Sequence, residues 1–169
     1  MQELISKIEQ WANDRNIING TKPIDQAMKL FSEFSELADN VGKGRDCRDD
    51  IGDVFVVLTI MTAQHGHSID DHLSTCVKGY NLKGTVIELC ENLTIFSSAQ
   101  HLEYEKEQEA LSMATCLLES IALQNGSSLE ECVQLAYNDI KDRKGIVHNG
   151  VFIKESDPAY SDIVTLYQN

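Results

Sequence analysis

The stretch KLFSEFSELADNVGKGRDCRDDIGDVFVVLTIMTAQHG, residues 29–66, sets the fold that the rest of the chain must accommodate. Apolar residues recur every three or four positions before the short basic loop GKGRDC. The segment IGDVFVVLTIMTA after the loop is apolar on almost every side, which is typical of a helix in the middle of a bundle. We therefore predict one helix from Pro23 to about Val41 and another from about Arg48 to Gln64. The residues expected to face inward on the first are Ile24, Ala27, Met28, Phe31, Phe34, Leu37 and Ala38.

Outward from this stretch, nearly every segment is also expected to be helical. Residues 3–15 carry an apolar stripe at helical spacing, HNGVFIKE (148–155) indicates a turn followed by a short extended piece, and the tail 157–169 indicates a terminal helix. GHSIDDHL (66–73) and GSSLEECV (126–133) both place a glycine and then a capping serine after an apolar helix, 60 residues apart. We predict an all-α helical bundle of two tandem helix-pair units, residues 1–82 and 83–169, within one compact fold.

The two units are unequal in their acidic residues. When the sequence is aligned with itself at a shift of 60 positions, Ala110 and Met113 lie opposite Asp50 and Asp53. The same shift places the apolar residues Leu93 and Phe96 opposite Glu33 and Glu36. We therefore expect the second unit to be a degenerate copy that holds no metal and supports the first.

Composition excludes several classes of protein. A formal net charge of −13 over 169 residues argues against a general nucleic-acid binder, which needs a basic face. No apolar run approaches the roughly 18 residues that span a membrane, and the N-terminus lacks the pattern of a signal peptide, so we expect a cytoplasmic protein. The five cysteines include no CxxC pair, and we expect them to be reduced thiols rather than disulfides or zinc ligands.

Four acidic residues form the strongest candidate site. Glu33 and Glu36 lie three positions apart on one expected helix, and Asp50 and Asp53 repeat that spacing on the next. The short loop between the helices makes them antiparallel neighbours, so the four carboxylates can meet at one level of the bundle. Hard oxygen ligands without cysteine or histidine favour Mg²⁺, with Mn²⁺ as a substitute. The alternative is that Glu33 and Glu36 lie on a solvent-exposed helix face and that Asp50 is an acid of the kind favoured at a helix start. Asp53 fits this alternative poorly, because it is surrounded by apolar residues.

On these residues, the stretch 29–66 resembles the catalytic segment of MazG-like pyrophosphohydrolases, whose pattern is EExxE, a loop, then ExxD and an apolar run. The resemblance implies that Glu33, Glu36, Asp50 and Asp53 are magnesium ligands. Ser32 departs from the pattern where a first glutamate is expected, and Asp50 replaces a glutamate. LEECVQLAYNDIKDRKGIVHNGVFIKE, residues 129–155, resembles the C-terminal segment of short members of this family.

The resemblance implies Mg²⁺-dependent hydrolysis of a nucleoside triphosphate to the monophosphate and pyrophosphate. Glu33, Glu36 and Asp53 are the expected catalytic residues, with Glu36 accepting the proton from water. The degenerate unit is expected to help grip the base. We also expect a homodimer, because the apolar helix needs more cover than few partners provide. The residues expected to bind the substrate are Lys29, Lys78, Asn81, Asn138, Lys141, Arg143 and Lys144.

Other functions stay open. One alternative is a related all-α pyrophosphatase that acts on dUTP, dCTP or phosphoribosyl-ATP. Another is a degenerate helical protein that binds nucleotide or a partner without turnover, and Ser32 in place of the first glutamate supports it. A di-iron bundle is disfavoured because Asp53, not histidine, follows Asp50 by three positions. We expect His65, His67 and His72 to be exposed polar residues. We expect Trp11, Phe31 and Phe34 to be core residues.

Overall fold

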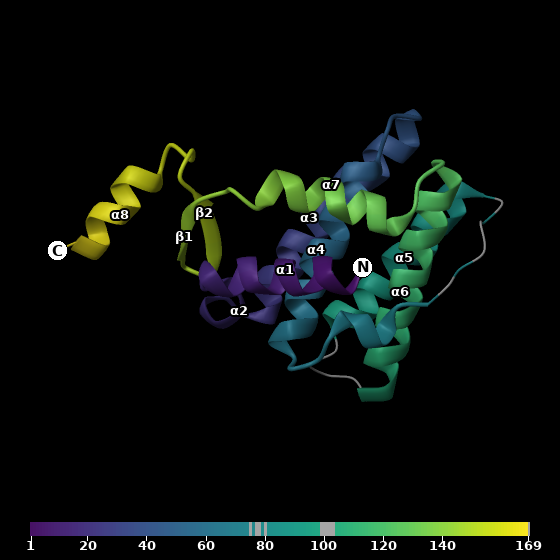
Figure 1. Ribbon diagram of the computed structural model, residues 1–169, viewed down its shortest axis with the longest axis horizontal. Helices are drawn as coiled ribbons and strands as arrows, with labels where there is room; N and C mark the ends of the chain where they lie inside the picture. Colours follow the sequence, from purple (N-terminus) through teal and green to yellow (C-terminus); the bar gives the residue numbers. More distant parts are fainter. Residues whose placement is uncertain (75, 77–78, 80, 99–103, 169) are drawn as a thin grey trace.

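The computed structural model describes residues 1–74, 76, 79, 81–98 and 104–168 of the chain. Over these residues it contains eight α-helices, one 3-10 helix and one two-stranded hairpin, which confirms the prediction of an all-α fold (Figure 1). The expected substrate-binding residue Lys78 lies outside the described residues. In chain order the elements are α1 (Gln2–Asp14), α2 (Ile17–Gly20), α3 (Pro23–Lys43), α4 (Arg48–Gln64), η1 (Ile69–His72), α5 (Leu82–Ser97), α6 (Tyr104–Gln124), α7 (Leu129–Ile140), β1 (Gly145–His148), β2 (Val151–Lys154) and α8 (Tyr160–Gln168).

Helix α4 forms the centre of the bundle, as its sequence predicts. Its residues from Ile51 to Thr62 are buried, apart from Asp53, beneath α1, α2, α3, α6 and α7. Gly52 allows α7 to approach closely, because a Cβ atom there would lie 2.2 Å from the carbonyl oxygen of Cys132. Because α4 is covered within one chain, its apolar character no longer argues for a homodimer, and the homodimer stays a prediction.

Helices α3 and α4 form one pair and α5 and α6 form another, and the pairs meet where α3 contacts α5 and α4 contacts α6. Glycines with positive φ follow α4 and α6, at Gly66 (80°) and Gly126 (75°). The cap that follows each glycine also forms, because Ser68 accepts a hydrogen bond from the Asp70 amide and Ser128 accepts one from the Glu131 amide. The unit boundary between residues 82 and 83 stays a prediction.

The two caps lead to different structures. The first starts only the four-residue η1, whereas the second starts the twelve-residue α7. Asn81, one of the expected substrate-binding residues, directly precedes α5. It caps the start of α5, where its side-chain oxygen accepts a hydrogen bond from the Gly84 amide at 3.1 Å. The chain after η1 instead lies against α6, since Thr115 donates a hydrogen bond to the His72 carbonyl at 2.6 Å.

The inward face of α3 is rotated from the expected one. Ile24 and Met28 are 53% and 61% exposed, so their expected inward orientation is wrong. The residues that α3 buries are Gln26, Ala27, Leu30, Glu33, Leu37 and Val41. Two of these, Gln26 and Glu33, are polar and line an internal pocket. A prediction from apolar spacing alone does not detect such residues.

A disulfide joins Cys76 to Cys116 on α6, with Cα atoms 5.3 Å apart, so the expectation that all five cysteines are reduced is wrong for this pair. The two cysteines are 40 positions apart in the sequence, and only the packing of the segment after η1 on α6 brings them together. Cys47 and Cys132 are buried free thiols and Cys90 is a partly buried one.

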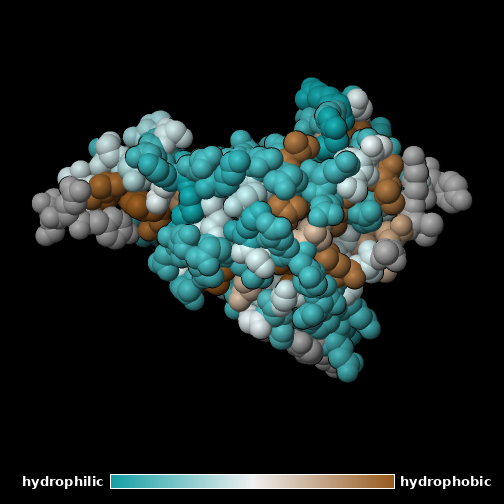
Figure 2. Space-filling view, in the orientation of Figure 1, coloured by the Kyte–Doolittle hydropathy of each residue, from teal (hydrophilic) through white to brown (hydrophobic). Residues whose placement is uncertain are grey.

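The chain ends in the β1–β2 hairpin and α8, at the opposite end of the molecule from α5 and α6 (Figure 1). Asn149 and Gly150 have φ values of 50° and 79°, which suit the two-residue turn between antiparallel strands. The face shown in Figure 2 is largely hydrophilic, with small apolar patches, one of them at the hairpin and α8 end. Among the helices that the structure describes, none combines the length and apolar composition needed to cross a lipid bilayer.

Candidate functional site

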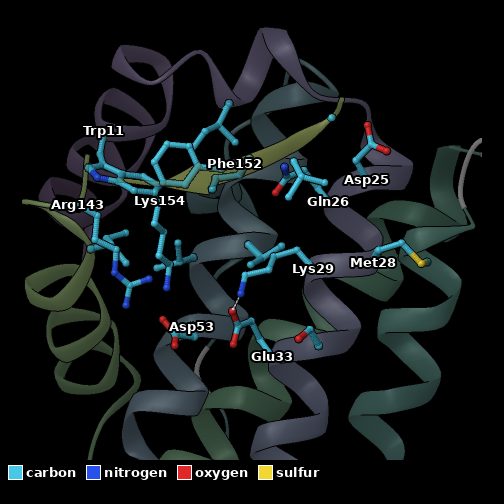
Figure 3. A pocket seen from close by; sticks show the side chains of 18 residues that line it. Trp11, Asp25, Gln26, Met28, Lys29, Glu33, Asp53, Arg143, Phe152 and Lys154 are labelled. Atoms are coloured by element: carbon cyan, nitrogen blue, oxygen red, sulfur yellow. Dashed lines mark ion pairs between the residues drawn. The ribbon is translucent and has the colours of Figure 1, made fainter. Parts of the chain in front are cut away.

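A cavity of about 390 Å³ opens between α1, α3, α4, the end of α7 and β2 (Figure 3). One end is charged and the rest is mainly apolar. The charged lining residues are Asp25, Lys29, Glu33, Asp53, Arg143 and Lys154. The larger apolar ones are Trp11, Ile17, Met28, Val56, Val57, Ile60, Ile140, Val151 and Phe152.

Two carboxylates, Glu33 of α3 and Asp53 of α4, line the charged end of the cavity from neighbouring helices. Glu33 is only 7% exposed. Burial, together with the nearby carboxylates of Glu33 and Asp49, raises the pKa of Asp53 to about 7 against the opposing effects of Arg143 and Lys29. Asp53 is polar on an otherwise buried helix because it faces this cavity.

The other two expected metal ligands lie outside the cavity lining. Asp50 is half-buried and accepts a hydrogen bond from Asn40 Nδ2 at 2.8 Å. Burial raises the pKa of Asp50, while this hydrogen bond opposes the shift. Glu36 is exposed, one turn from Glu33. Within the described ranges, no group of three or more His, Cys, Asp or Glu side chains is arranged to hold a metal ion. Ser32, at the position of the expected first glutamate, does line the cavity.

Three cations face the two carboxylates, and they differ in their partners. Lys29 forms an ion pair with Glu33, and Arg143 forms one with Asp139. The side chain of Lys154 extends from β2 towards Asp53, as Figure 3 shows. Burial lowers the pKa of Lys154, and the positive charges of Arg143 and Lys29 lower it further.

The expected substrate-binding residues divide into two groups. Lys29 and Arg143 line the cavity, and Asn138, Lys141 and Lys144 are exposed and do not. Asn81 lies at the start of α5, and neither α5 nor α6 contributes a described side chain to the cavity lining. The part of the second unit that reaches the cavity is therefore the end of α7 and the hairpin. Sequence reasoning missed Lys154 and Phe152, whose signal is their two-residue spacing on a short extended segment.

Aromatic residues form the wall between α1 and the hairpin. The rings of Trp11 and Phe152 pack edge to face, with centroids 5.9 Å apart. Trp11 is 8% exposed, so it is a core residue as expected and a pocket residue as well. Arg15 stacks on Trp11 at 4.9 Å and donates a hydrogen bond to the Arg143 carbonyl at 2.7 Å. These contacts anchor the chain that leads into the hairpin.

A hydrogen-bond network fixes the amide of Gln26 beside the cavity. Gln26 Nε2 donates to Thr21 Oγ1 at 2.9 Å, and the Thr21 hydroxyl donates to the Ile17 carbonyl at 2.8 Å. The Thr21 hydroxyl donates its only proton to the Ile17 carbonyl, so it can only accept a hydrogen bond from Gln26. The atom of the Gln26 amide that faces Thr21 is therefore the nitrogen. The Gln26 side chain therefore has its oxygen left as an acceptor at the cavity wall.

Comparison with known proteins gives one partial match. No protein-family model matches the chain, and no solved structure matches it. The chain is 45% identical over 67 residues to the "uncharacterized 18.2 kDa protein in rep-hol intergenic region" of Haemophilus phage HP1 (strain HP1c1). The match covers 38% of this chain and 41% of the phage protein, so the chain spans less than half of that relative's length.

Proposed function

We propose that this chain is a Mg²⁺-dependent pyrophosphohydrolase that converts a nucleoside triphosphate to the monophosphate and pyrophosphate. The observation that carries the proposal is the cavity, where two carboxylates, Glu33 and Asp53, face three cations, Lys29, Arg143 and Lys154. A triphosphate that arrives with a divalent cation needs both kinds of group. The resemblance of residues 29–66 to the MazG-like catalytic segment supports the same reaction.

The carboxylates fit a magnesium ion by their chemistry. Mg²⁺ is commonly held by one or two carboxylates together with substrate phosphates and water, rather than by a cage of protein ligands. Glu33 and Asp53 are hard oxygen donors whose buried charges repel each other, as the raised pKa of Asp53 shows. In this proposal they hold the ion, with Asp50 beside them. The bound ion would neutralise phosphate charge and acidify a water molecule.

The protein side chains divide the remaining tasks between the two ends of the cavity. At the charged end, Arg143 binds phosphate oxygens that the ion does not reach. Glu36, which the resemblance gives as the acceptor of the water proton, would act from its exposed position one turn from Glu33, while Asp53 holds the ion. At the apolar end, Trp11 and Phe152 exclude water beside a base, and the free acceptor of Gln26 favours a base that presents an N–H group.

Ser32 supports a second candidate, nucleotide binding without turnover. It lines the cavity where the MazG-like pattern has its first glutamate, so one carboxylate fewer is available there. Base selectivity, including preference for dUTP, dCTP or phosphoribosyl-ATP, depends on the shape of the apolar end.

The experiment that tests the proposal is pyrophosphate release from a panel of canonical and modified triphosphates with Mg²⁺. Asp53→Asn should lower the rate by about 100-fold or more, because it removes a charged ligand from the site. Asp46→Asn is the matched control, since Asp46 is exposed, pairs with Arg48 and lies outside the cavity lining. Release of pyrophosphate at equal rates by wild type and Asp53→Asn would refute this site. Tight binding without release would favour the second candidate.

A further inference from the structure

We propose that the β1–β2 hairpin is part of the substrate-binding site and that Lys154 binds the polyphosphate chain of the substrate. This inference rests on the proposed function and deepens it, because it assigns a phosphate-binding charge to a residue outside the basic segment NDIKDRKG, residues 138–145. The hairpin would act as a fixed arm that brings the Lys154 ammonium group to the carboxylates of α3 and α4.

The distribution of ion pairs singles out Lys154 among the cations of the cavity. Lys29 is paired with Glu33, and Arg143 is paired with Asp139. The ammonium group of Lys154 has no ion pair or hydrogen bond to any residue that the structure describes. An ammonium group that is partly withdrawn from water and lies near two other cations is stabilised by an anion. An anionic group of a ligand is therefore a suitable partner for the Lys154 ammonium group.

Strand geometry directs Lys154 and Phe152 to the same side. Side chains two positions apart on a strand share a face, and both of these residues line the cavity while Ile153 between them does not. Phe152 is anchored by its edge-to-face contact with Trp11. The position of Phe152 against α1 thus determines where Lys154 is presented.

The two ends of the hairpin are also tightly placed. At the tip, a Cβ atom on Gly150 would lie 2.4 Å from the Asp25 carboxylate at the start of α3. At the base, the Glu155 amide donates a hydrogen bond to the Lys144 carbonyl at 2.8 Å, and Gly145 pairs with Lys154 across the strands. Because the hairpin is held at its tip and at its base, the backbone at Lys154 loses little further conformational entropy when a ligand binds.

The ligand class follows from the charges. One ammonium group beside a site for a divalent ion suits a chain of two or more phosphates, because the ion and the lysine can bind different phosphate groups. A monophosphate bound by the ion alone gains little from Lys154. The contribution of Lys154 should therefore rise with the number of phosphates in the ligand.

Binding of inorganic tripolyphosphate and of inorganic phosphate, measured calorimetrically with Mg²⁺ present, tests the inference by a readout other than catalysis. Lys154→Gln should weaken tripolyphosphate binding by about tenfold, as expected for loss of one hydrogen bond between charged groups. Phosphate binding should change by less than about twofold. Lys154→Arg should retain most of the affinity, and Lys83→Gln on the exposed start of α5 is the charge-matched control.

In turnover experiments, Lys154→Gln should raise KM by about tenfold with kcat less affected, because the lysine binds substrate and transition state alike. Tripolyphosphate binding that is equal in wild type and folded Lys154→Gln, or absent from wild type, would overturn the inference. Weaker binding by Lys154→Gln in a protein that releases no pyrophosphate would leave this phosphate site standing and remove the proposed hydrolase function.

Discussion

The two helix pairs of this protein have the same local signals and different chemistry. In the α3–α4 pair, Glu33 and Asp53 line a cavity, whereas the equivalent positions in the α5–α6 pair hold Leu93, fully buried, and Met113, 43% exposed. Glu33 and Leu93 thus occupy comparable inward positions, one with a carboxylate and one with an isobutyl group. The difference shows that an inward helix position accepts a charge only where a charged cavity surrounds it.

The elements that cover the two helix pairs also differ. The α3–α4 pair is covered on one side by α1, the hairpin and the segment between α7 and β1, and Lys154 of the hairpin and Arg143 of that segment line the cavity with the carboxylates. The α5–α6 pair is instead cross-linked to the preceding segment by the Cys76–Cys116 disulfide, and neither cysteine lines the cavity. Covering elements, rather than the pairs themselves, decide where charge is tolerated.

Leu93→Glu is expected to have the largest effect on stability, because it places the acid of the first pair into the apolar surroundings of the second. Burial of an unpaired carboxylate at this fully buried position should lower the free energy of unfolding by about 3–5 kcal/mol. Urea denaturation at pH 7.5 measures it. Leu93→Met is the matched control and should cost less than about 1.5 kcal/mol. A Leu93→Glu protein as stable as wild type would mean that the second pair also contains a polar site.

The pH dependence of stability should reflect the buried acid of the first pair. The folded-state pKa of Asp53 is raised to about 7 by burial, so the folded protein binds its proton more tightly than the unfolded chain. The contribution of Asp53 to stability is therefore present below pH 4 and is lost as the pH rises towards 7. Asp53→Asn lacks this loss and should be more stable than wild type at pH 8 by about 2–4 kcal/mol.

Denaturation midpoints between pH 4 and pH 8, measured with a chelator, test this expectation. Asp46→Asn provides a control of opposite sign, because Arg48 lowers the pKa of Asp46 to about 2. That variant should lose stability at neutral pH and keep the wild-type slope between pH 4 and pH 8. Parallel profiles for wild type and Asp53→Asn would show that Asp53 is not buried as described.

Glu33→Leu makes the first pair resemble the second and is expected to have the smallest of these effects on stability. Replacement of a buried ion-pair member by a packed apolar side chain can be neutral or stabilising, so we expect a gain of about 1 kcal/mol, seen as a higher thermal midpoint. Exposed Lys29 can return to water after the change. Pyrophosphate release should be lost in the same protein. Retained activity in Glu33→Leu would remove Glu33 from the proposed site.

Local sequence predicted the parts of this fold that depend on neighbouring residues. The helix Arg48–Gln64 has the expected bounds, and the glycine and serine caps after α4 and α6 form as expected. These features follow from apolar periodicity and backbone hydrogen bonding within a few residues. The first cap nevertheless starts only a 3-10 turn, whose last residue, His72, accepts a hydrogen bond from Thr115 of α6.

The sequence by itself determined the all-α class, the central position of α4 and the presence of acids on two neighbouring helices. Tertiary structure alone decided that Glu33 and Asp53 share a cavity while Glu36 and Asp50 do not line it, and that Lys154 arrives from a hairpin about 100 positions further along the chain. The physical reason is range. Helices form from interactions between residues three or four positions apart, whereas a charged cavity needs partners from distant segments to offset the cost of burying its charges.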